Sequence, residues 1–209
     1  MAKLYITWKE FSEVWLVERI ENCYGFNEEG FMFDTGGGKE QMVSFMFKED
    51  IAQYNEWRRR ASRMARLTDA RLKHMRGVAE MMYNMVIEAE GPEDYAREMF
   101  VLGMLHDLGY AFQDGRRNHP QVVGDILRRC GYKYWQEVYN HGNPETTYSS
   151  NELNLLDWAD LCTSSDGEPC SIHERIARNL KKDGLDAPVT QNKIKLGKRI
   201  GLLGEDEYV

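Results

Sequence analysis

The chain has 209 residues, 42% of them hydrophobic and 29% charged, which is typical of a globular protein with one main domain and room for a small extra module. Its formal net charge of −7 argues against broad nucleic-acid binding, which depends on a basic surface. No apolar run approaches the roughly 20 residues of a membrane span, and the first residues lack the apolar core of a signal peptide, so we expect a cytoplasmic protein with no membrane partner.

Residues 1–51 are expected to form a small α+β module. Thr7 and Glu10 have the spacing of a capping box, and apolar residues recur at helical spacing after them. This pattern predicts a helix that ends near Asn22. A strand through Val14–Val17 is the alternative that the same residues leave open.

The second part of this module is predicted to be a β-hairpin. The segments Gly30–Asp34 and Gln41–Phe47 have the composition of strands, and Gly36–Gly38 can form the turn between them. The sequence leaves the role of the module open. It could cover a pocket of the main domain or form the contact of a homodimer.

Residues 52–209 are expected to form a mainly α, all-helical bundle, because the apolar period is helical throughout. One or two helices are expected within Ala52–Ala89. The later predicted helices are Glu93–Leu108, Asn118–Cys130, Tyr132–Asn140, Ser150–Cys162, Ser171–Lys182 and Gln191–Leu202. Asn118 and Ser171 are each followed three residues later by Gln or Glu, which is the pattern of a capped helix start.

Histidines are concentrated in the predicted helical domain, where four of the five precede residue 142. One of them forms the pair His106-Asp107 at the end of an apolar helix. A further acid, Asp160, lies in an apolar stretch, where a carboxylate is costly unless it is paired. Imidazole and carboxylate ligands suit Mn, Fe and Zn. The candidate metal ligands are therefore His74, His106, Asp107, His119, His141 and Asp160.

Four of these residues also have an interpretation without a metal, and the pair His106-Asp107 is the exception, because Leu-His-Asp-Leu-Gly after an apolar helix is fairly specific by itself. His74 could be a core or surface histidine, and His119 a helix residue with no special role. His141 could be favoured by the dipole at a helix C-terminus. Asp160 could pair with an arginine. The fifth histidine, His173, is expected on the surface of a helix.

The order of the candidate ligands resembles that of the HD superfamily of metal-dependent phosphohydrolases, over roughly residues 60–180. His74 resembles the first histidine of the family, His106-Asp107 resembles its name-giving pair, and Asp160 resembles its closing aspartate. The resemblance implies an HD-type helical bundle that binds a divalent transition metal.

The two remaining histidines, His119 and His141, resemble those of two-metal members such as the symmetrical dinucleoside-tetraphosphate hydrolases. The resemblance therefore implies two ions, which could be Fe, Mn, Zn or Co, with Asp107 as the bridging catalytic residue. Tyr110 departs from the family, because many relatives carry Lys or an acid shortly after the His-Asp pair. This departure leaves the proton donor unassigned.

The resemblance also implies hydrolysis of a phosphate ester or phosphoanhydride in a small substrate, with a nucleotide as the first expectation. Two metal ions can activate a water and stabilise the attacking and leaving oxygens. The alternative is a non-catalytic nucleotide-binding or regulatory module, which Tyr110 and the unassigned N-terminal module favour. A purely structural helical domain is the third interpretation.

Phosphate binding also requires cationic side chains. The candidates are Arg116, Arg117, Arg76 and Lys133, the first two because they lie between Asp107 and His119. A basic segment, Arg58–Arg76, could be a solvated helix face, or it could bring Arg71 or Arg76 to the substrate. RNA binding is not expected, because aromatic residues are not clearly interleaved with the charges.

The cysteines, Cys23, Cys130, Cys162 and Cys170, are scattered and form no Cys-x-x-Cys pair. A chain of this length does not need disulfides, and a cytoplasmic location keeps thiols reduced. We expect free thiols and no zinc–cysteine site.

Overall fold

The computed structural model describes residues 3–5, 23–27, 30–34, 40–44, 68–111, 115–129 and 132–208. The chain divides into two compact units, one made of residues 1–72 and 107–139 and the other of residues 73–106 and 140–209. We call them the Asp107 unit and the His74 unit. From residue 68 onward the described elements are helices, in agreement with the prediction of a mainly helical domain.

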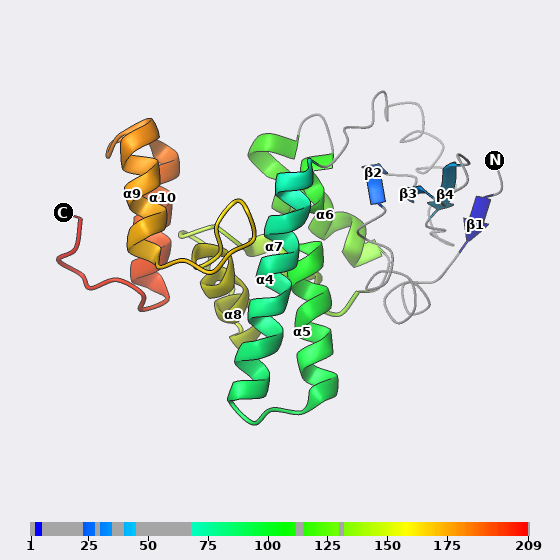
Figure 1. The fold of residues 1–209 in the computed structure, drawn as a ribbon, viewed down its shortest axis with the longest axis horizontal. Coiled ribbons are helices and arrows are strands. Elements are labelled where there is room, and N and C mark those ends of the chain that lie inside the picture. The colour runs from blue at the N-terminus through cyan, green and yellow to red at the C-terminus, as the bar shows by residue number, and fades with distance from the viewer. Residues whose placement is uncertain are drawn as a thin grey trace. The chain divides into compact units, whose positions relative to one another are not determined.

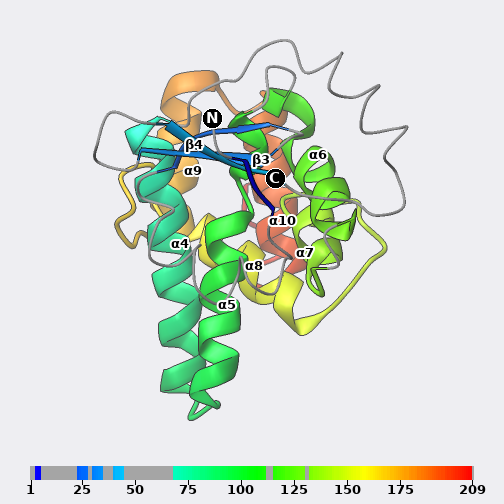
Figure 2. The same cartoon turned by 90° about the vertical axis from the view of Figure 1, so that its right-hand side faces the viewer.

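Two antiparallel helices, α4 (Asp69–Glu88, whose first four residues belong to the Asp107 unit) and α5 (Glu93–Leu105), lie side by side (Figures 1 and 2). A side chain at Gly103 would place its Cβ 2.6 Å from the Cα of Ala79, so this glycine allows close contact between the helices. The residues buried along the pair include Met75, Val78, Ala79, Met82, Ala96, Met99, Leu102 and Leu105. Their apolar surface stabilises the pair through the hydrophobic effect.

Helix α8 (Asn151–Leu161) begins at an N-cap, Ser150, whose hydroxyl accepts a hydrogen bond of 3.0 Å from the Leu153 amide. Such a cap satisfies one of the backbone N–H groups that a helix start leaves unpaired. The predicted helix Ser150–Cys162 therefore differs from the observed one only by its two capping residues.

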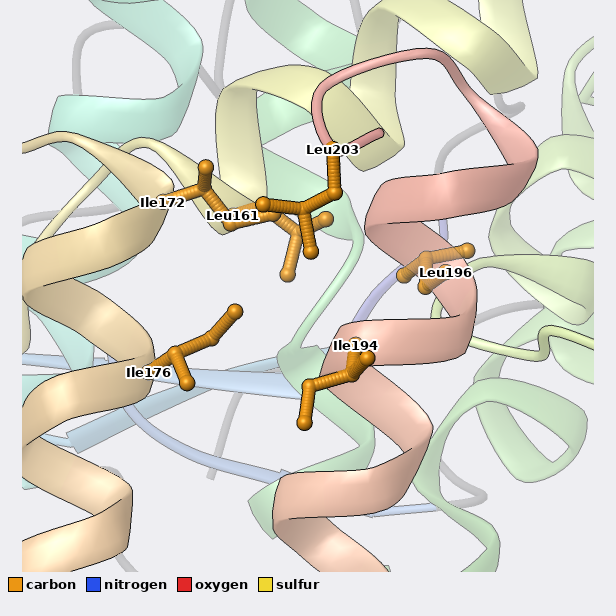
Figure 3. Close-up of a cluster of buried hydrophobic side chains, with 6 residues drawn as sticks. All are labelled: Leu161, Ile172, Ile176, Ile194, Leu196 and Leu203. Carbon is orange, nitrogen blue, oxygen red and sulfur yellow. The ribbon is translucent and has the colours of Figure 1, made fainter. Parts of the chain in front are cut away.

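Helices α9 (Ile172–Asp183) and α10 (Pro188–Arg199) pack together near the C-terminus. The predicted capping box of α9 is confirmed: Ser171 caps the helix and Glu174 binds back to it. Helix α10 begins three residues earlier than predicted because Pro188, with its fixed φ, suits a first helical turn. Figure 3 shows the apolar cluster that joins both helices to the end of α8, made of Leu161, Ile172, Ile176, Ile194, Leu196 and Leu203.

In the Asp107 unit a 3-10 helix, η3 (Leu108–Ala111), precedes α6 (Gly115–Arg129) and α7 (Trp135–Asn140, whose last residue belongs to the His74 unit). Three predicted helix boundaries are wrong here, and one of them is the start of α7, which lies at Trp135 and not at Tyr132. The helix expected to reach Leu108 ends at Leu105, because η3 takes over after a turn at His106 and Asp107. Helix α6 begins at Gly115 and not after Asn118, so that Pro120 lies inside the helix and not in its first turn.

The Asp107 unit also contains a four-stranded sheet with the order β1-β4-β3-β2. Its strands are β1 (Lys3–Tyr5), β2 (Cys23–Asn27), β3 (Gly30–Asp34) and β4 (Glu40–Ser44). Strand β1 is parallel to β4, whereas β3 is antiparallel to both of its neighbours. The helix expected before Asn22, its strand alternative and the glycine turn at 36–38 lie outside the described residues, so the hairpin-containing α+β module stays a prediction.

Within the described part of the chain, none of the helices combines the length and the apolarity that a membrane span requires. Two of the four cysteines, Cys162 and Cys170, are described there as free thiols. This agrees with the expectation of unpaired cysteines at these two positions.

Candidate metal centre

His74 and Asp160 form the central contact of the His74 unit. His74 is buried on α4, and its Nδ1 donates a hydrogen bond of 2.9 Å to the backbone carbonyl of Ser164. Its Nε2 lies 2.9 Å from Oδ1 of Asp160, on α8. Because a carbonyl can only accept, Nδ1 carries the proton of a neutral ring, and Nε2 then directs a lone pair at the carboxylate. Either a second proton on the imidazole or a cation between the two groups would make this contact favourable.

Two glycines, Gly77 and Gly167, bring the loop that carries Ser164 onto α4. A Cβ at Gly77 would lie 2.8 Å from the Cα of Gly167, and a Cβ at Gly167 would lie 3.0 Å from the carbonyl carbon of Lys73. Gly167 also has a φ of +84°, which disfavours other residues. The loop therefore packs backbone to backbone on the helix, and its Ser164 carbonyl reaches His74.

Asp160 has a second cationic neighbour in Arg175 of α9. The Arg175 guanidinium lies 3.6 Å from Oδ1 of Asp160 and also donates to the carbonyl of Thr163. Burial raises the pKa of Asp160, but the hydrogen bond and charge of His74 and the charge of Arg175 lower it further, so the pKa lies well below its usual value. The arginine partner that the sequence left open for Asp160 is thus present, together with a histidine.

Two further candidate ligands, His106 and His141, lie in the same unit. His106 is fully buried just after α5, and its Nδ1 donates a hydrogen bond of 2.6 Å to the carbonyl of Gly103. Its ring centroid lies 5.6 Å from that of His74 and 5.1 Å from that of His141, each pair in an edge-on arrangement. Three buried imidazoles and the Asp160 carboxylate are therefore gathered within one unit, and a proton on Nδ1 of His106 leaves its Nε2 as the possible ligand atom.

The turn that carries His141 is fixed by a carboxylate that the sequence analysis missed. Gly142 follows His141 with a φ of +69°, and its amide donates a hydrogen bond of 2.7 Å to Oδ1 of Asp157. Asp157 is fully buried on α8 and forms an ion pair with Arg199 of α10. Arg199 also donates a hydrogen bond of 2.9 Å to the carbonyl of Asn143.

Burial also sets the ionisation of Asp157. It raises the pKa of this carboxyl to about 6, although the Gly142 amide and the charges of His141 and Arg199 act in the opposite direction. One signal of its importance was present in the sequence. Asp157 precedes Asp160 by three residues in the same apolar segment, where an unpaired carboxylate would be equally costly.

In the Asp107 unit, the Asp107 carboxylate is in contact with one arginine and one histidine. Arg71 donates a hydrogen bond to Oδ2 of Asp107, whose Oδ1 lies 3.1 Å from Nε2 of His119. The Tyr110 ring stacks on His119, with centroids 4.1 Å apart, and the Arg71 guanidinium carbon lies 3.9 Å from the Tyr110 centroid. Two groups so close to one centroid must occupy opposite faces of the ring, so Tyr110 is held between Arg71 and His119.

Gly109 makes this arrangement possible. Its φ is not in the positive range, but a Cβ at this position would lie 2.7 Å from the Cα of His119. The glycine therefore allows η3 to approach the α6 backbone closely, which brings His119 to Asp107.

The four expected phosphate-binding residues are placed as follows. Arg76 is exposed on α4 and pairs with Glu80 one helical turn later, as on a solvated helix face. Lys133 is exposed, with its Nζ 4.5 Å from the Tyr134 ring centroid. Arg116 and Arg117 lie in the first turn of α6, and their side chains are outside the described part of the structure.

The buried histidine and aspartate groups of this chain could hold a metal ion. In the His74 unit a ring nitrogen of His106 lies within 4.8 Å of one from His74, and in the Asp107 unit a carboxylate oxygen of Asp107 lies within 4.8 Å of a ring nitrogen of His119. Imidazole with carboxylate is a donor set for divalent transition metals, so the residues fit such an ion. No family model, curated protein or solved structure matches this chain.

Proposed function

We propose that this protein is an HD-type, metal-dependent phosphohydrolase that acts on a small phosphorylated substrate, with a nucleotide as the first expectation. The observation that carries the proposal is the gathering of His74, His106, His141 and Asp160 within the His74 unit. The adjoining residue, Asp107, contacts His119 in its own unit. Because one peptide bond joins His106 to Asp107, we propose that all six residues serve as ligands of two ions.

The chain's own residues supply the remaining requirements of the reaction. A bound divalent ion would lower the pKa of a water and neutralise charge on the phosphoryl oxygens. The Ser164 and Gly103 carbonyls fix the tautomers of His74 and His106, each with its proton on Nδ1 and its lone pair on Nε2. An aspartate is ionised at neutral pH, and the charge of the Arg175 guanidinium lowers the pKa of Asp160, so this carboxylate is ready to act as a ligand.

Arg71 is the cation best placed to bind the phosphoryl group. Its guanidinium already contacts a carboxylate, Asp107, and the planar fork of donors that suits a carboxylate also suits a phosphoryl group. Tyr110 supports this guanidinium from one side. We propose that Arg71 exchanges Asp107 for a substrate oxygen when an ion takes the carboxylate. Arg116 and Arg117, in the first turn of α6, would add positive charge beside a helix N-terminus.

Metal analysis of the purified protein tests this proposal. Protein prepared without a chelator or a histidine tag should contain close to two transition-metal ions per chain, and His119→Ala close to one. Loaded protein should then release phosphate or nucleoside phosphate from a panel of mononucleotides, dinucleoside polyphosphates and phosphomonoesters. Metal-loaded protein that leaves the whole panel unchanged would contradict the proposed hydrolysis, and absence of metal after reloading would contradict the site.

A non-catalytic nucleotide-binding module is the second candidate. The ion pair between Arg71 and Asp107 favours it, because the guanidinium then occupies the carboxylate that would bridge two ions. Tight nucleotide binding without product, measured in the presence of Mn²⁺, would support this candidate, and turnover would exclude it. The cytoplasmic location and a homodimer stay predictions.

A further inference from the structure

We propose that the buried ion pair of Asp157 and Arg199 is a positioning device for His141, and that it links the C-terminal helix α10 to the metal site. The proposal deepens the proposed function, on which its consequence for metal binding rests. The contact with His141 is indirect, because Asp157 holds the residue that follows it. Neither Asp157 nor Arg199 is proposed to touch a metal or a substrate.

The geometry around the turn carries this inference. One carboxylate oxygen of Asp157 accepts the Gly142 amide at 2.7 Å, and the other accepts from Arg199. Arg199 reaches the same turn again through the Asn143 carbonyl at 2.9 Å. The residues on the C-terminal side of His141 are therefore held at two successive points, one by α8 and one by α10.

If the pair only stabilised the packing of α8 against α10, charged side chains would not be required at these two positions. The Asp157 side chain has no exposed surface and that of Arg199 is 24% exposed, and a buried ion pair is often replaceable by apolar residues without loss of stability. What apolar residues cannot supply is an acceptor for the Gly142 amide. Gly142 has a positive φ, so this turn has a backbone that few residues adopt, and an oriented acceptor specifies it.

Another ion pair between α10 and the same region provides a matched control. Lys195, one turn before Arg199, pairs with Glu145 at 3.0 Å, but both side chains are more than half exposed. Lys195→Ala removes this link without changing any contact to Gly142 or Asn143. An exposed pair of this kind contributes little to stability.

The first test uses metal-free protein and records long-range ¹H–¹⁵N spectra of the histidine rings. Asp157→Ala should shift the His141 ring-nitrogen signals, whereas the signals of exposed His173 should stay in place. The double variant Asp157→Leu/Arg199→Met keeps the site filled with apolar volume and should fold even where Asp157→Ala does not. It should shift His141 in the same way, and unchanged His141 signals in this variant would overturn the proposal.

The second test measures the Zn²⁺ dissociation constant by competition with a chromophoric chelator, at a temperature where each variant is folded. We expect binding about tenfold weaker in the double variant, which is the lower end of the effect of losing an outer partner of a metal ligand. Lys195→Ala should bind as the wild type does. Equal affinity in the double variant would overturn the link to the metal site. If the wild-type protein binds neither Zn²⁺ nor Mn²⁺, Fe²⁺ or Co²⁺, the proposed function fails, and the spectra still decide whether Asp157 positions His141.

Discussion

Nε2 of His74 lies 2.9 Å from Oδ1 of Asp160, although 86 positions separate the two residues in the chain. The contact depends on α4 and α8 and on the loop that follows α8, because the same imidazole donates to Ser164 in that loop. A histidine with a fixed tautomer beside an ionised carboxylate is a suitable pair of metal ligands.

Asp160→Asn should remove most of the metal bound by the His74 unit. The amide has nearly the shape of the carboxylate but carries no negative charge, so it is a much poorer ligand. We expect at least a tenfold fall in metal affinity and a similar or larger fall in any phosphohydrolase rate. Glu80→Gln, which changes an exposed carboxylate on α4, is the control and should alter neither quantity. Metal content equal to wild type in Asp160→Asn would exclude Asp160 as a ligand.

Gly77→Ala should destabilise the protein by about 2 kcal/mol or more, because the added methyl group overlaps the backbone of Gly167 and overpacking costs about 1–3 kcal/mol. Gly184→Ala is a matched control, since Gly184 has a positive φ but open space around its Cα. It should cost only about 1 kcal/mol. Urea unfolding of both variants measures the difference. An equal fall in the free energy of unfolding of the two variants would show that the close packing of the loop on α4 is not needed for stability.

Tyr110 offers a test of both its ring and its hydroxyl. Tyr110→Phe keeps the stack with Arg71 and His119 and should retain the activity, which would exclude the hydroxyl as the proton donor. Tyr110→Ala removes the support of both groups and should lower kcat by about tenfold or more, as a loss of positioning does. Steady-state kinetics on the substrate found in the nucleotide panel measures both variants. A loss in Tyr110→Phe as large as in Tyr110→Ala would instead make the hydroxyl a participant.

Asp157 should make stability depend on pH in mildly acidic solution. Its pKa is about 6 in the folded protein against 3.8 ordinarily, so between these values the folded state holds a proton that the unfolded chain has released. The free energy of unfolding therefore falls as the pH rises through this window, by about 3 kcal/mol in total, and is level above it.

The Asp157→Asn variant has no carboxyl group to ionise at this position. Comparing its stability with that of the wild-type protein therefore isolates the contribution of Asp157 to the pH dependence. Thermal unfolding at several pH values from 4 to 7 provides the measurement, with Asp125→Asn as a control at an exposed carboxylate on α6. The wild-type protein should lose stability relative to Asp157→Asn as the pH rises. Parallel curves for the two proteins would show that the pKa of Asp157 is not raised.

Local signals in the sequence predicted part of the local structure. The predicted cap of α9 is confirmed, because the Ser171 side chain accepts a backbone amide three residues later and such a contact needs no tertiary partner. The cap predicted at Asn118 is wrong, because α6 already begins at Gly115. The end of α5 was predicted wrongly, because apolar spacing continues through Leu108 while the backbone changes to a 3-10 turn. Spacing alone cannot distinguish these two helical forms.

The candidate site was predictable in its residue types and less so in its contacts. Histidines and aspartates in an apolar context indicate a site, because burying them alone is costly. The partners of Asp160 and Asp157 could not be predicted, since Arg175 and Arg199 are two of many arginines and only the packing of α9 and α10 selects them. Arg71 was one of two arginines of the basic segment that could reach the substrate, but its contact with Asp107 could not be predicted from the sequence.

The backbone contact between Gly77 and Gly167 also provides a pattern by which distant relatives of this chain could be recognised. Neither position can carry a side chain while the loop packs against α4. Each also has a defined sequence spacing from a candidate ligand, because Gly77 lies three residues after His74 and Gly167 lies seven residues after Asp160. A chain that shares this site should therefore carry His-x-x-Gly early and Asp followed by Gly seven residues later. Two such glycines can persist where overall sequence similarity has been lost, because glycine is the one amino acid that has no Cβ.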